Sequence, residues 1–509
     1  MTASASVTLS LISHTNVGKT TLARTLLRRD VGEVRDQAHV TDRSERYILA
    51  EVDGAQLVLW DTPGLGNTVR LMGRVRGQSS PIGWLLSQVW DRLADRPFWS
   101  TQQAIKNARD EADAVLYLVN ATEEPSQAAY VSSELELLTW IGRPVLVVLN
   151  QTGPALPMLA GEPGAAEASR LERIWRDHAA SWPIVRDVLA LDAFSRCWVQ
   201  ESVLFMRLLP LLPMEKHPTL EGCAAVWRER SLVVLRQAVE RMASYLVATA
   251  ADREVMATPR PGVFGRIAAF APAAGRRAMR QLRERLETRT RQLVDALVAD
   301  HGLDGHSRLK LHERLEHFVV IGDEWLTPGK GAIVGGAVSG ALGGLAADAA
   351  AAGLTFGGGA VLGAILGALG GAGLAAGYRL VQGEREPGVS WAPAFLSDLS
   401  RQTLLRYLAI AHFGRGRGGY EDFELPSRWA ELVDEIEAAY EPNLAEIWAL
   451  GARTDPAALS EAKFRLLPLL ETLTTAVLAR GYPDAASWLM PSASPRLPGL
   501  LHPTRVSRT

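Results

Sequence analysis

The sequence predicts an α/β domain with a mostly parallel sheet and helices on both faces, followed by an all-α C-terminal half. In the first two hundred residues, short apolar runs alternate with helical patterns. The runs 114–119 and 144–149 are continuously apolar, which is typical of strands that a parallel sheet buries on both faces. Past residue 213 the strand patterns stop, and long helical periodicity replaces them.

The same patterns divide the chain into four predicted regions. They are an α/β domain over residues 1–212, a helical region with a basic amphipathic helix over 213–330, a Gly/Ala-rich apolar hairpin over 331–377, and a C-terminal helical region with a flexible tail over 378–509. A chain of 509 residues is long enough for several domains of this kind.

Composition excludes some classes of protein. The chain has 54 basic and 56 acidic residues, so no global field points to nucleic acid, and we expect no nucleic-acid partner. The two cysteines, Cys197 and Cys223, predict neither a disulfide framework nor a zinc site and fit a reducing cytosol. We expect no signal peptide, since the first apolar run leads directly into a functional motif.

That motif is the octet from Ser13 to Thr20, Ser-His-Thr-Asn-Val-Gly-Lys-Thr. A β-branched run at 7–12 precedes it and a helical pattern at 21–27 follows it, which is the context of a phosphate-binding P-loop. The loop amides and the positive helix end would bind an anion, Lys19 would reach the β- and γ-phosphates, and the Thr20 hydroxyl would hold Mg²⁺. Because Ser13 replaces the usual first glycine, a chance Gly-Lys-Thr at a helix start is the alternative.

Two further motifs follow along the chain. Thr41 lies in a polar stretch, 30–44, of the kind that forms a mobile loop. Two strand-like runs, joined by the turn pair Asp53-Gly54, then end in Asp61-Thr62-Pro63-Gly64. An aspartate at the end of an apolar strand can anchor the Mg²⁺ shell through water, and the Gly64 N–H can sense a γ-phosphate.

The order of these motifs resembles the Era/TrmE-like branch of P-loop GTPases. The resemblance covers about the first two hundred residues, and it includes Asn150 at the base-reading position. It implies GTP and GDP as ligands and hydrolysis of GTP to GDP and phosphate. The nucleotide-binding residues it implies are Asn16, Val17, Gly18, Lys19, Thr20, Thr21, Asp61, Gly64, Asn150 and Gln151. The Mg²⁺ ligands it implies are Thr20, Thr41 and Asp61, and the catalytic residues are Lys19, Thr41 and Gly64.

The chain departs from the family pattern at its catalytic and base-reading positions. Leu65 stands where Ras-like enzymes place the glutamine that orients the attacking water, so the chain resembles the hydrophobic-substituted GTPases. Some of these enzymes hold K⁺ with an asparagine at the position of Asn16; an asparagine that caps the loop backbone is the alternative. The Asn-Lys-x-Asp base motif has Gln151 for its lysine and Gly153 for its aspartate. We still expect GTP in preference to ATP.

The connection from Gly64 to the strand at 114 is longer than such a connection needs to be. Large apolar side chains recur along it at near-helical spacing: Trp84, Leu85, Leu86, Val89, Trp90, Leu93, Phe98 and Trp99. This pattern is compatible with a helix that packs on its own domain. It is equally compatible with a switch-coupled surface that presents aromatic anchors to a partner protein or to the C-terminal half.

The predicted helix over 278–301 is strongly basic. Its arginines, with those just before it, are Arg276, Arg277, Arg280, Arg283, Arg285, Arg289 and Arg291. An ordinary solvated face is one interpretation of this run. A second is contact with anionic lipid head groups, because a basic amphipathic helix is typical of a membrane surface. Nucleic acid is the third, and no aromatic interleaving supports it.

The hairpin 331–377 has the most unusual composition, with Asp348 as its one charged residue. Its glycines recur four apart, as in a glycine zipper: Gly336, Gly340, Gly344, and Gly359, Gly363, Gly367, Gly371. Lys330 and Arg379 flank the hairpin, so both ends would stay cytoplasmic if it entered the inner membrane. A soluble hairpin packed within the helical half is the alternative.

The C-terminal half resembles an uncharacterised bacterial domain fused to Era-like GTPase domains, which implies no known activity. Together these patterns favour a cytoplasmic GTPase switch, slow or stimulated by a partner, that couples its nucleotide state to a membrane-associated helical domain. A protein effector or a homo-oligomer would be its partner. The alternative is a nucleotide-binding scaffold or membrane-remodelling protein with little or no hydrolysis, which Leu65 and the degraded base motif favour.

Overall fold

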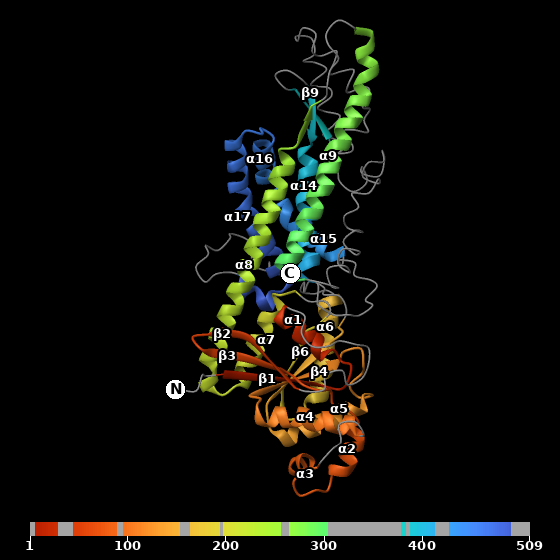
Figure 1. Ribbon diagram of the computed structural model, residues 1–509, viewed down its shortest axis with the longest axis vertical. Helices are drawn as coiled ribbons and strands as arrows, with labels where there is room; N and C mark the ends of the chain where they lie inside the picture. The colour runs from red at the N-terminus through yellow and green to blue at the C-terminus, as the bar shows by residue number, and fades with distance from the viewer. Residues whose placement is uncertain are drawn as a thin grey trace, which may run out of the picture.

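The protein is seen here in a computed structural model. It describes residues 6–28, 44–88, 95–152, 163–193, 197–255, 264–303, 378–382, 387–412 and 427–489. Several features named above lie outside the described residues: Thr41 with nearly all of the stretch 30–44, Gly153, Lys330, the hairpin 331–377 and the tail after 489. Figure 1 shows an elongated molecule with the α/β domain at one end and a helical half extending from it.

The α/β domain is built on a six-stranded sheet in the order β2-β3-β1-β4-β5-β6. The strands are β1 (Ser6–Ser13), β2 (Glu45–Val52), β3 (Ala55–Asp61), β4 (Ala114–Asn120), β5 (Val145–Asn150) and β6 (Val185–Ala190). All neighbours are parallel except β2 and β3, which form an antiparallel hairpin. Asp53 and Gly54 connect this hairpin with φ of 49° and 80°, as the turn pair predicts. The predicted fold class is confirmed.

Each face of the sheet has its own apolar core. One core contains residues of α1 (Lys19–Leu27), α7 (Gln200–Leu208) and the first half of α8 (His217–Ala250). The other contains residues of α2 (Thr68–Val75), α3 (Pro81–Ser87), α4 (Arg96–Asp110), α5 (Ala129–Ile141) and α6 (Pro163–Ala179). Leu9 and Leu11 of β1 enter the first core and Ile12 enters the second, so the strand that leads into the loop is packed on both faces.

Much of the long connection after Gly64 packs on its own domain. Helices α2, α3 and α4 all lie within it, and Leu85 and Phe98 are buried in the second core. The guanidinium groups of Arg70 and Arg74 lie over the Phe98 ring, 5.8 and 4.9 Å from its centroid. The residues 89–94, which include Trp90, are outside the described part of the chain.

Helix α8 joins the two halves of the molecule. It has 34 residues, about 50 Å at 1.5 Å per residue. Its first turns place Leu220 and Trp227 in a core of the α/β domain, and its last turns place Leu246 and Ala250 in the core of the helical half. Figure 1 shows it rising beside β2 and β3 into the helical half. This one helix therefore contributes side chains to the cores of both halves.

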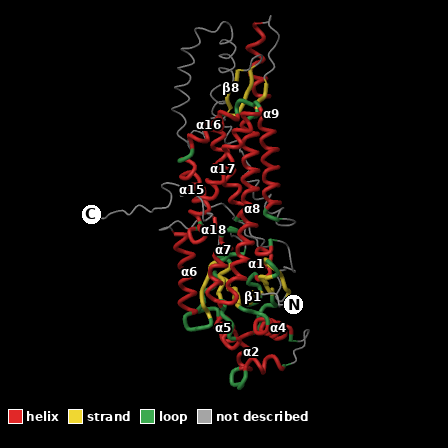
Figure 2. The backbone as a smooth tube through the Cα atoms, turned by 90° about the vertical axis from the view of Figure 1, so that its left-hand side faces the viewer, coloured by secondary structure: helices red, strands yellow, loops and turns green. Residues whose placement is uncertain are grey.

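The helical half contains α9 (Phe264–Asp300), α14 (Pro393–Ala411), α15 (Ser427–Ala438), α16 (Glu441–Gly451), α17 (Pro456–Gly481) and α18 (Ala486–Leu489). Short 3₁₀ turns lie at Leu209–Leu211, Met214–Lys216 and Pro483–Ala485. The long helices follow the long axis of the molecule (Figure 2). A small antiparallel sheet, which the sequence patterns did not predict, lies at the end far from the α/β domain (Figure 1). Its strands, in the order β7-β9-β8, are Arg253–Val255, Pro387–Trp391 and Tyr378–Gln382.

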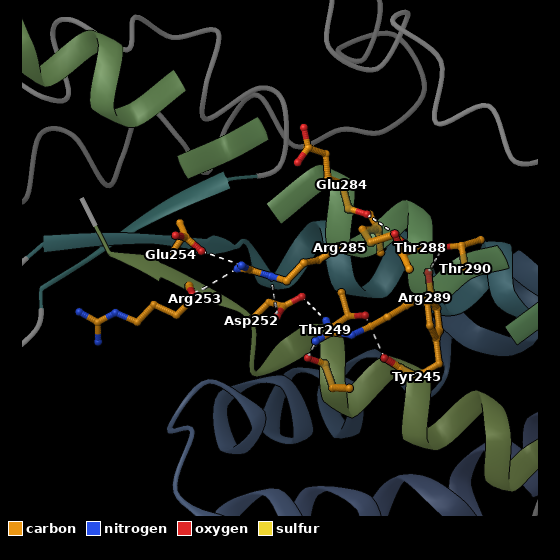
Figure 3. A network of polar contacts seen from close by, with 12 residues as sticks. Tyr245, Thr249, Asp252, Arg253, Glu254, Glu284, Arg285, Thr288, Arg289 and Thr290 are labelled. Carbon is orange, nitrogen blue, oxygen red and sulfur yellow. Dashed lines mark hydrogen bonds and ion pairs between the residues drawn. The ribbon is translucent and has the colours of Figure 1, made fainter. Parts of the chain in front are cut away.

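Part of the basic run on α9 serves this architecture. Figure 3 shows Arg285 and Arg289 pointing to the segment that links α8 with β7. Arg285 Nη1 lies 2.6 Å from Glu254 Oε2, and both arginines form ion pairs with Asp252, which is 8% exposed. These two arginines therefore pair with acidic side chains of the protein itself.

Within the described ranges, no helix combines the length and the apolar character that crossing a bilayer requires.

Candidate functional site

The octet forms the turn between β1 and α1. Gly18 precedes the first helical residue with φ of 102°, and Asn16 takes φ of 67°. Left-handed backbone of this kind is open to glycine and, among other residues, best tolerated by asparagine. Val17 is buried in the core below the loop, while Asn16 is exposed. The loop thus turns its backbone at the start of α1, where helix amides bind anions.

Lys19 lies inside the loop. It is 7% exposed, and its Nζ donates a hydrogen bond of 3.1 Å to Ser13 Oγ. Burial lowers the pKa of Lys19, while the negative charges of Asp61 and Glu134 act in the opposite direction. Ser13, at the position of the usual first glycine, therefore supplies a hydroxyl that holds the lysine in the loop.

Asp61 ends β3 directly beside the loop. Its Oδ2 accepts a hydrogen bond of 2.7 Å from Thr20 Oγ1, and the residue is 1% exposed. Burial raises the pKa of Asp61, and its Oδ1 has no hydrogen-bond partner among the described residues. A buried carboxylate oxygen without a partner is costly unless a cation reaches it. The carboxylate and hydroxyl are the hard oxygen donors that Mg²⁺ prefers, so this pair fits a Mg²⁺ ion.

Gly64 brings the chain after β3 against the loop. A Cβ on Gly64 would lie 2.9 Å from Thr15 Cγ2 and 3.1 Å from Thr15 Cα, so this approach requires glycine. Next to it, Leu65 N donates a hydrogen bond of 2.9 Å to Ser13 O. The Leu65 side chain is fully buried in the second core with Ile12 and does not face the loop.

Asn150 ties the loop to the other strands. Its Nδ2 donates to Val17 O and its Oδ1 accepts from Ala193 N, each at 2.7 Å. The residue is fully buried at the end of β5, and Gln151 follows it with φ of 60°. The amide of Asn150 thus connects the P-loop with the end of β6.

Sequence reasoning missed a polar network on the other side of the loop. Its centre is Glu134 of α5, which is fully buried. Glu134 Oε1 lies 2.7 Å from His14 Nδ1, and its Oε2 accepts a hydrogen bond of 2.8 Å from Tyr117 OH. One signal was available, since Glu134 shares a helix face with the apolar residues Val131 and Leu138.

The predicted residues that are described, from Asn16 to Thr21 with Asp61, Gly64, Asn150 and Gln151, thus gather at the carboxyl ends of β1, β3 and β5. In the part of the chain that is described, no group of three or more His, Cys, Asp or Glu side chains is placed to hold a metal ion by itself. A Mg²⁺ ion here would depend on Thr20 and Asp61 with further ligands from a nucleotide and water.

Two family models match the chain. Residues 8–151 match the 50S ribosome-binding GTPase model, and residues 186–463 match the model of a domain of unknown function (DUF3482). The first match makes the N-terminal domain a GTP-binding P-loop GTPase domain.

Similar solved structures include two of Era. One is an Aquifex aeolicus Era variant bound to GDP and AlF₄⁻, with 19% identity over 41% of this chain and 57% of that chain, at a TM-score of 0.29. The other is Era in complex with MgGDPNP and a segment of 16S ribosomal RNA, with 18% identity over 41% and 58%, at a TM-score of 0.29. A variant of SsGBP aligns at 18% identity over 40% and 54%, at a TM-score of 0.23.

This chain therefore spans less than two thirds of each of these solved chains. The DUF3482 model, by contrast, covers more than half of the present chain. The protein belongs to the DUF3482 family and carries a P-loop GTPase domain at its N-terminus.

Proposed function

We propose that the protein binds GTP with Mg²⁺ in the P-loop and hydrolyses it to GDP and phosphate, slowly or under stimulation by a partner. The arrangement of polar groups around Asp61 supports this proposal most directly. A buried carboxylate oxygen without a hydrogen-bond partner in the described chain lies beside the Thr20 hydroxyl, and the charge of Lys19 acts on the same carboxylate. A Mg²⁺-triphosphate needs hard oxygen donors next to a phosphate-binding lysine.

The residues have distinct roles in this proposal. Lys19 and the amides of 16–21 bind the phosphates, and the Gly64 N–H binds the γ-phosphate end, which its close approach to Thr15 favours. Thr20 and Asp61, together with Thr41, hold Mg²⁺. When bound, Mg²⁺ offsets negative charge on the β- and γ-phosphates.

Two finer features belong to the same proposal. Asn16 is exposed at the loop, and its side-chain oxygen would hold a K⁺ ion that adds positive charge beside the phosphates. Asn150 and Gln151 lie at the base-binding end, and GTP is the favoured nucleotide. The missing aspartate at Gly153 relaxes discrimination, because a site that pairs with its ligand's polar groups otherwise rejects analogues by about 10⁴-fold.

Calorimetry with the purified full chain tests nucleotide binding. MgGTP should bind, and Lys19→Ala should abolish both binding and hydrolysis, a loss of more than about a hundredfold in affinity, because the buried ammonium has no replacement. EDTA should weaken the affinity of the wild-type protein. The control is Lys106→Ala, which removes an exposed lysine of α4 in the same domain and should change nothing. Undiminished turnover in Lys19→Ala would contradict the proposal, and equal affinities for GTP and ATP would remove the preference for guanine.

The helical half would respond to the nucleotide through α1 and α8. Arg28, the capping residue after α1, donates hydrogen bonds to Glu201 Oε2 at 3.2 Å and to Ser231 Oγ of α8 at 2.7 Å. Glu201 is 1% exposed, so this junction is a fixed contact and not a surface pair. The γ-phosphate would order the loop around Thr41 and the segment after Asp61, and the helix rod would carry the change to an effector or to a second copy of the chain.

We further propose that the protein is cytoplasmic and associates with the inner membrane through the hairpin 331–377. The composition of this stretch supports the proposal, since about twenty apolar residues span a bilayer. The wild-type protein should remain in the membrane pellet after alkaline carbonate extraction, and a variant without 331–377 should move to the supernatant. Complete release of the wild-type protein would contradict membrane insertion.

A nucleotide-binding scaffold or membrane-remodelling protein with little hydrolysis is the second candidate. The burial of Leu65 in the core favours it, because no glutamine then orients a water from this position. Single-turnover hydrolysis with Mg²⁺, in K⁺ and in Na⁺, distinguishes the two. A measurable rate that K⁺ increases supports the GTPase, and bound GTP that persists in both salts supports the scaffold.

A further inference from the structure

We propose that Glu134 and His14 form a positioning pair for hydrolysis, in which the buried carboxylate of α5 holds the P-loop histidine and the start of α2 in their reactive arrangement. This inference rests on the proposed GTPase function and adds two residues to it, to which the family motifs assign no role.

The first observation is the contact itself. His14 is the second residue of the octet, and its Nδ1 lies 2.7 Å from Glu134 Oε1. The Glu134 side chain is fully buried, whereas the His14 side chain is 29% exposed. The imidazole also stacks on the Tyr130 ring, with centroids 4.3 Å apart. One contact therefore joins the phosphate-binding loop to a rigid helix of the domain.

The second observation is the number of elements that meet at Glu134. Besides His14 of the loop, it accepts a hydrogen bond from Tyr117 OH of β4 at 2.8 Å and from Thr68 Oγ1 at 3.4 Å. Thr68 is the first residue of α2, the helix that follows the Gly64 segment. The carboxylate thus connects the loop, the central sheet and the start of α2 through one side chain.

The charges around the pair support a role beyond packing. Burial raises the pKa of Glu134, while the hydrogen bond from His14 and the charge of Lys19 lower it. Lys19, His14 and Glu134 therefore interact electrostatically across the loop. A fully buried carboxylate is costly to keep, and such groups concentrate at functional sites.

A cleft lies in front of the His14–Glu134 pair. This cleft of about 700 Å³ is lined by His14, Thr15, Gly66, Asn67, Thr68 and Tyr130. Thr15 also contacts Gly64, so the cleft adjoins the end of the loop where the γ-phosphate would lie. Water can reach this end of the site through the cleft.

The position of Leu65 explains why hydrolysis would need a positioning pair. His14 and Leu65 face each other in a parallel β-bridge, and the Leu65 side chain is buried behind it. The segment that provides a water-orienting glutamine in Ras-like enzymes therefore provides only its backbone here. Hydrolysis then depends on how accurately the loop and the Gly64 N–H are held, and a misplacement of about 1 Å can cost about a hundredfold in rate.

Variants of the full-length protein test the pair. Hydrolysis is measured in single turnover, GTP affinity by calorimetry, and folding by the thermal midpoint. His14→Ala should slow hydrolysis by about ten- to a hundredfold while GTP affinity changes by less than about threefold. His14→Asn should restore the rate, because the asparagine amide lies where Nδ1 was and still donates to Glu134, although it cannot stack on Tyr130.

Glu134→Gln provides an independent variant with little change of volume. Its side chain has one acceptor oxygen where the network uses two, so the rate should fall by about tenfold. The control is Glu136→Gln on the same helix, where the wild-type carboxylate pairs with Arg76 at the surface. This change should leave the rate unaltered.

The outcomes separate the inference from the proposed function. A wild-type rate in His14→Ala or Glu134→Gln overturns the inference and leaves the GTPase intact. A rate in His14→Asn as low as in His14→Ala also overturns it, because stacking on Tyr130 would then be what matters. A wild-type protein that binds GTP without hydrolysing it overturns the inference but not nucleotide binding, and one that binds no GTP removes both.

Discussion

Two buried carboxylates, Glu134 in the α/β domain and Asp252 in the helical half, each gather polar groups from several elements. Asp252 lies between two arginines of α9, and Figure 3 shows its oxygens directed at both. Glu134 has no arginine or lysine within ion-pair distance among the described residues. Its partners there are an imidazole and two hydroxyl groups.

This difference in partners separates a structural network from a functional one. Two guanidinium groups offset the desolvation of Asp252 and fix the turn between α8 and β7. Glu134 is buried with weaker partners, next to a cleft and a phosphate-binding loop, and burial raises its pKa. Asp252 is thus held by ionic partners that fix the fold, whereas Glu134 lacks such partners and lies where perturbed groups often serve function.

A third carboxylate, Glu437 of α15, extends the comparison, because neighbouring groups offset the burial of its charge least. It is 7% exposed, and its Oε1 has no hydrogen-bond partner in the described part of the molecule. Burial raises its pKa from 4.5 to about 7, against the opposing effects of Ser400 and then Arg401. The charges of Asp434 and Asp398 add to the shift. The folded state therefore binds the proton more tightly than the unfolded state.

The largest expected effect on stability follows from this shift. The protonated Glu437 carboxyl makes its full contribution to the free energy of unfolding below pH 4.5. This contribution, at most about 3 kcal/mol, is lost as the pH rises to about 7. Glu437→Gln cannot ionise, so it should raise the free energy of unfolding at pH 8 by up to about that amount and change it little at pH 4.5. Urea unfolding at the two pH values measures this.

Glu435→Gln is the matched control for this change. Glu435 lies on the same helix, is exposed and pairs with Arg480 at 2.7 Å. Its replacement should shift stability by less than about 0.5 kcal/mol at either pH. If the free energy of unfolding depends on pH in the same way for Glu437→Gln and the wild-type protein, Glu437 ionises normally. Glu437 is then not the least compensated of the three carboxylates.

The three carboxylates also show which parts of the molecule the sequence predicts. Local patterns were sufficient for the centre of the parallel sheet, since β4 and β5 are continuous apolar runs up to a final asparagine, and for the loop from Ser13 to Thr20, since its chemistry lies in eight consecutive residues. Glu134 and His14 are 120 positions apart, and no local pattern connects them. The role of a buried charge depends on its distant partners, which spacing along the chain does not reveal.

The helical half shows the same limit. Strands β7 and β9 are short and lie more than a hundred residues apart in the chain, so their pairing has no local signal. The basic run on α9 looked like a continuous face because its acidic partners, Asp252 and Glu254, precede it on another element. Composition identified the arginines but could not assign them to solvent, lipid or protein.

The smallest expected effect comes from the fully compensated carboxylate. Asp252→Asn keeps the shape but removes the charge between Arg285 and Arg289, which are 36% and 31% exposed in their side chains. Water near these arginines offsets part of the loss, and Arg285 retains Glu254, so we expect the free energy of unfolding to fall by about 2 kcal/mol. GTP affinity should not change, because the α8–β7 turn is at the far end of α8 from the loop.

Urea unfolding with calorimetry tests both statements, with Glu284→Gln as the exposed control on α9. If GTP affinity fell as much as stability, the networks around Asp252 and Glu134 would act as one. The distinction between structural and functional carboxylates would then fail.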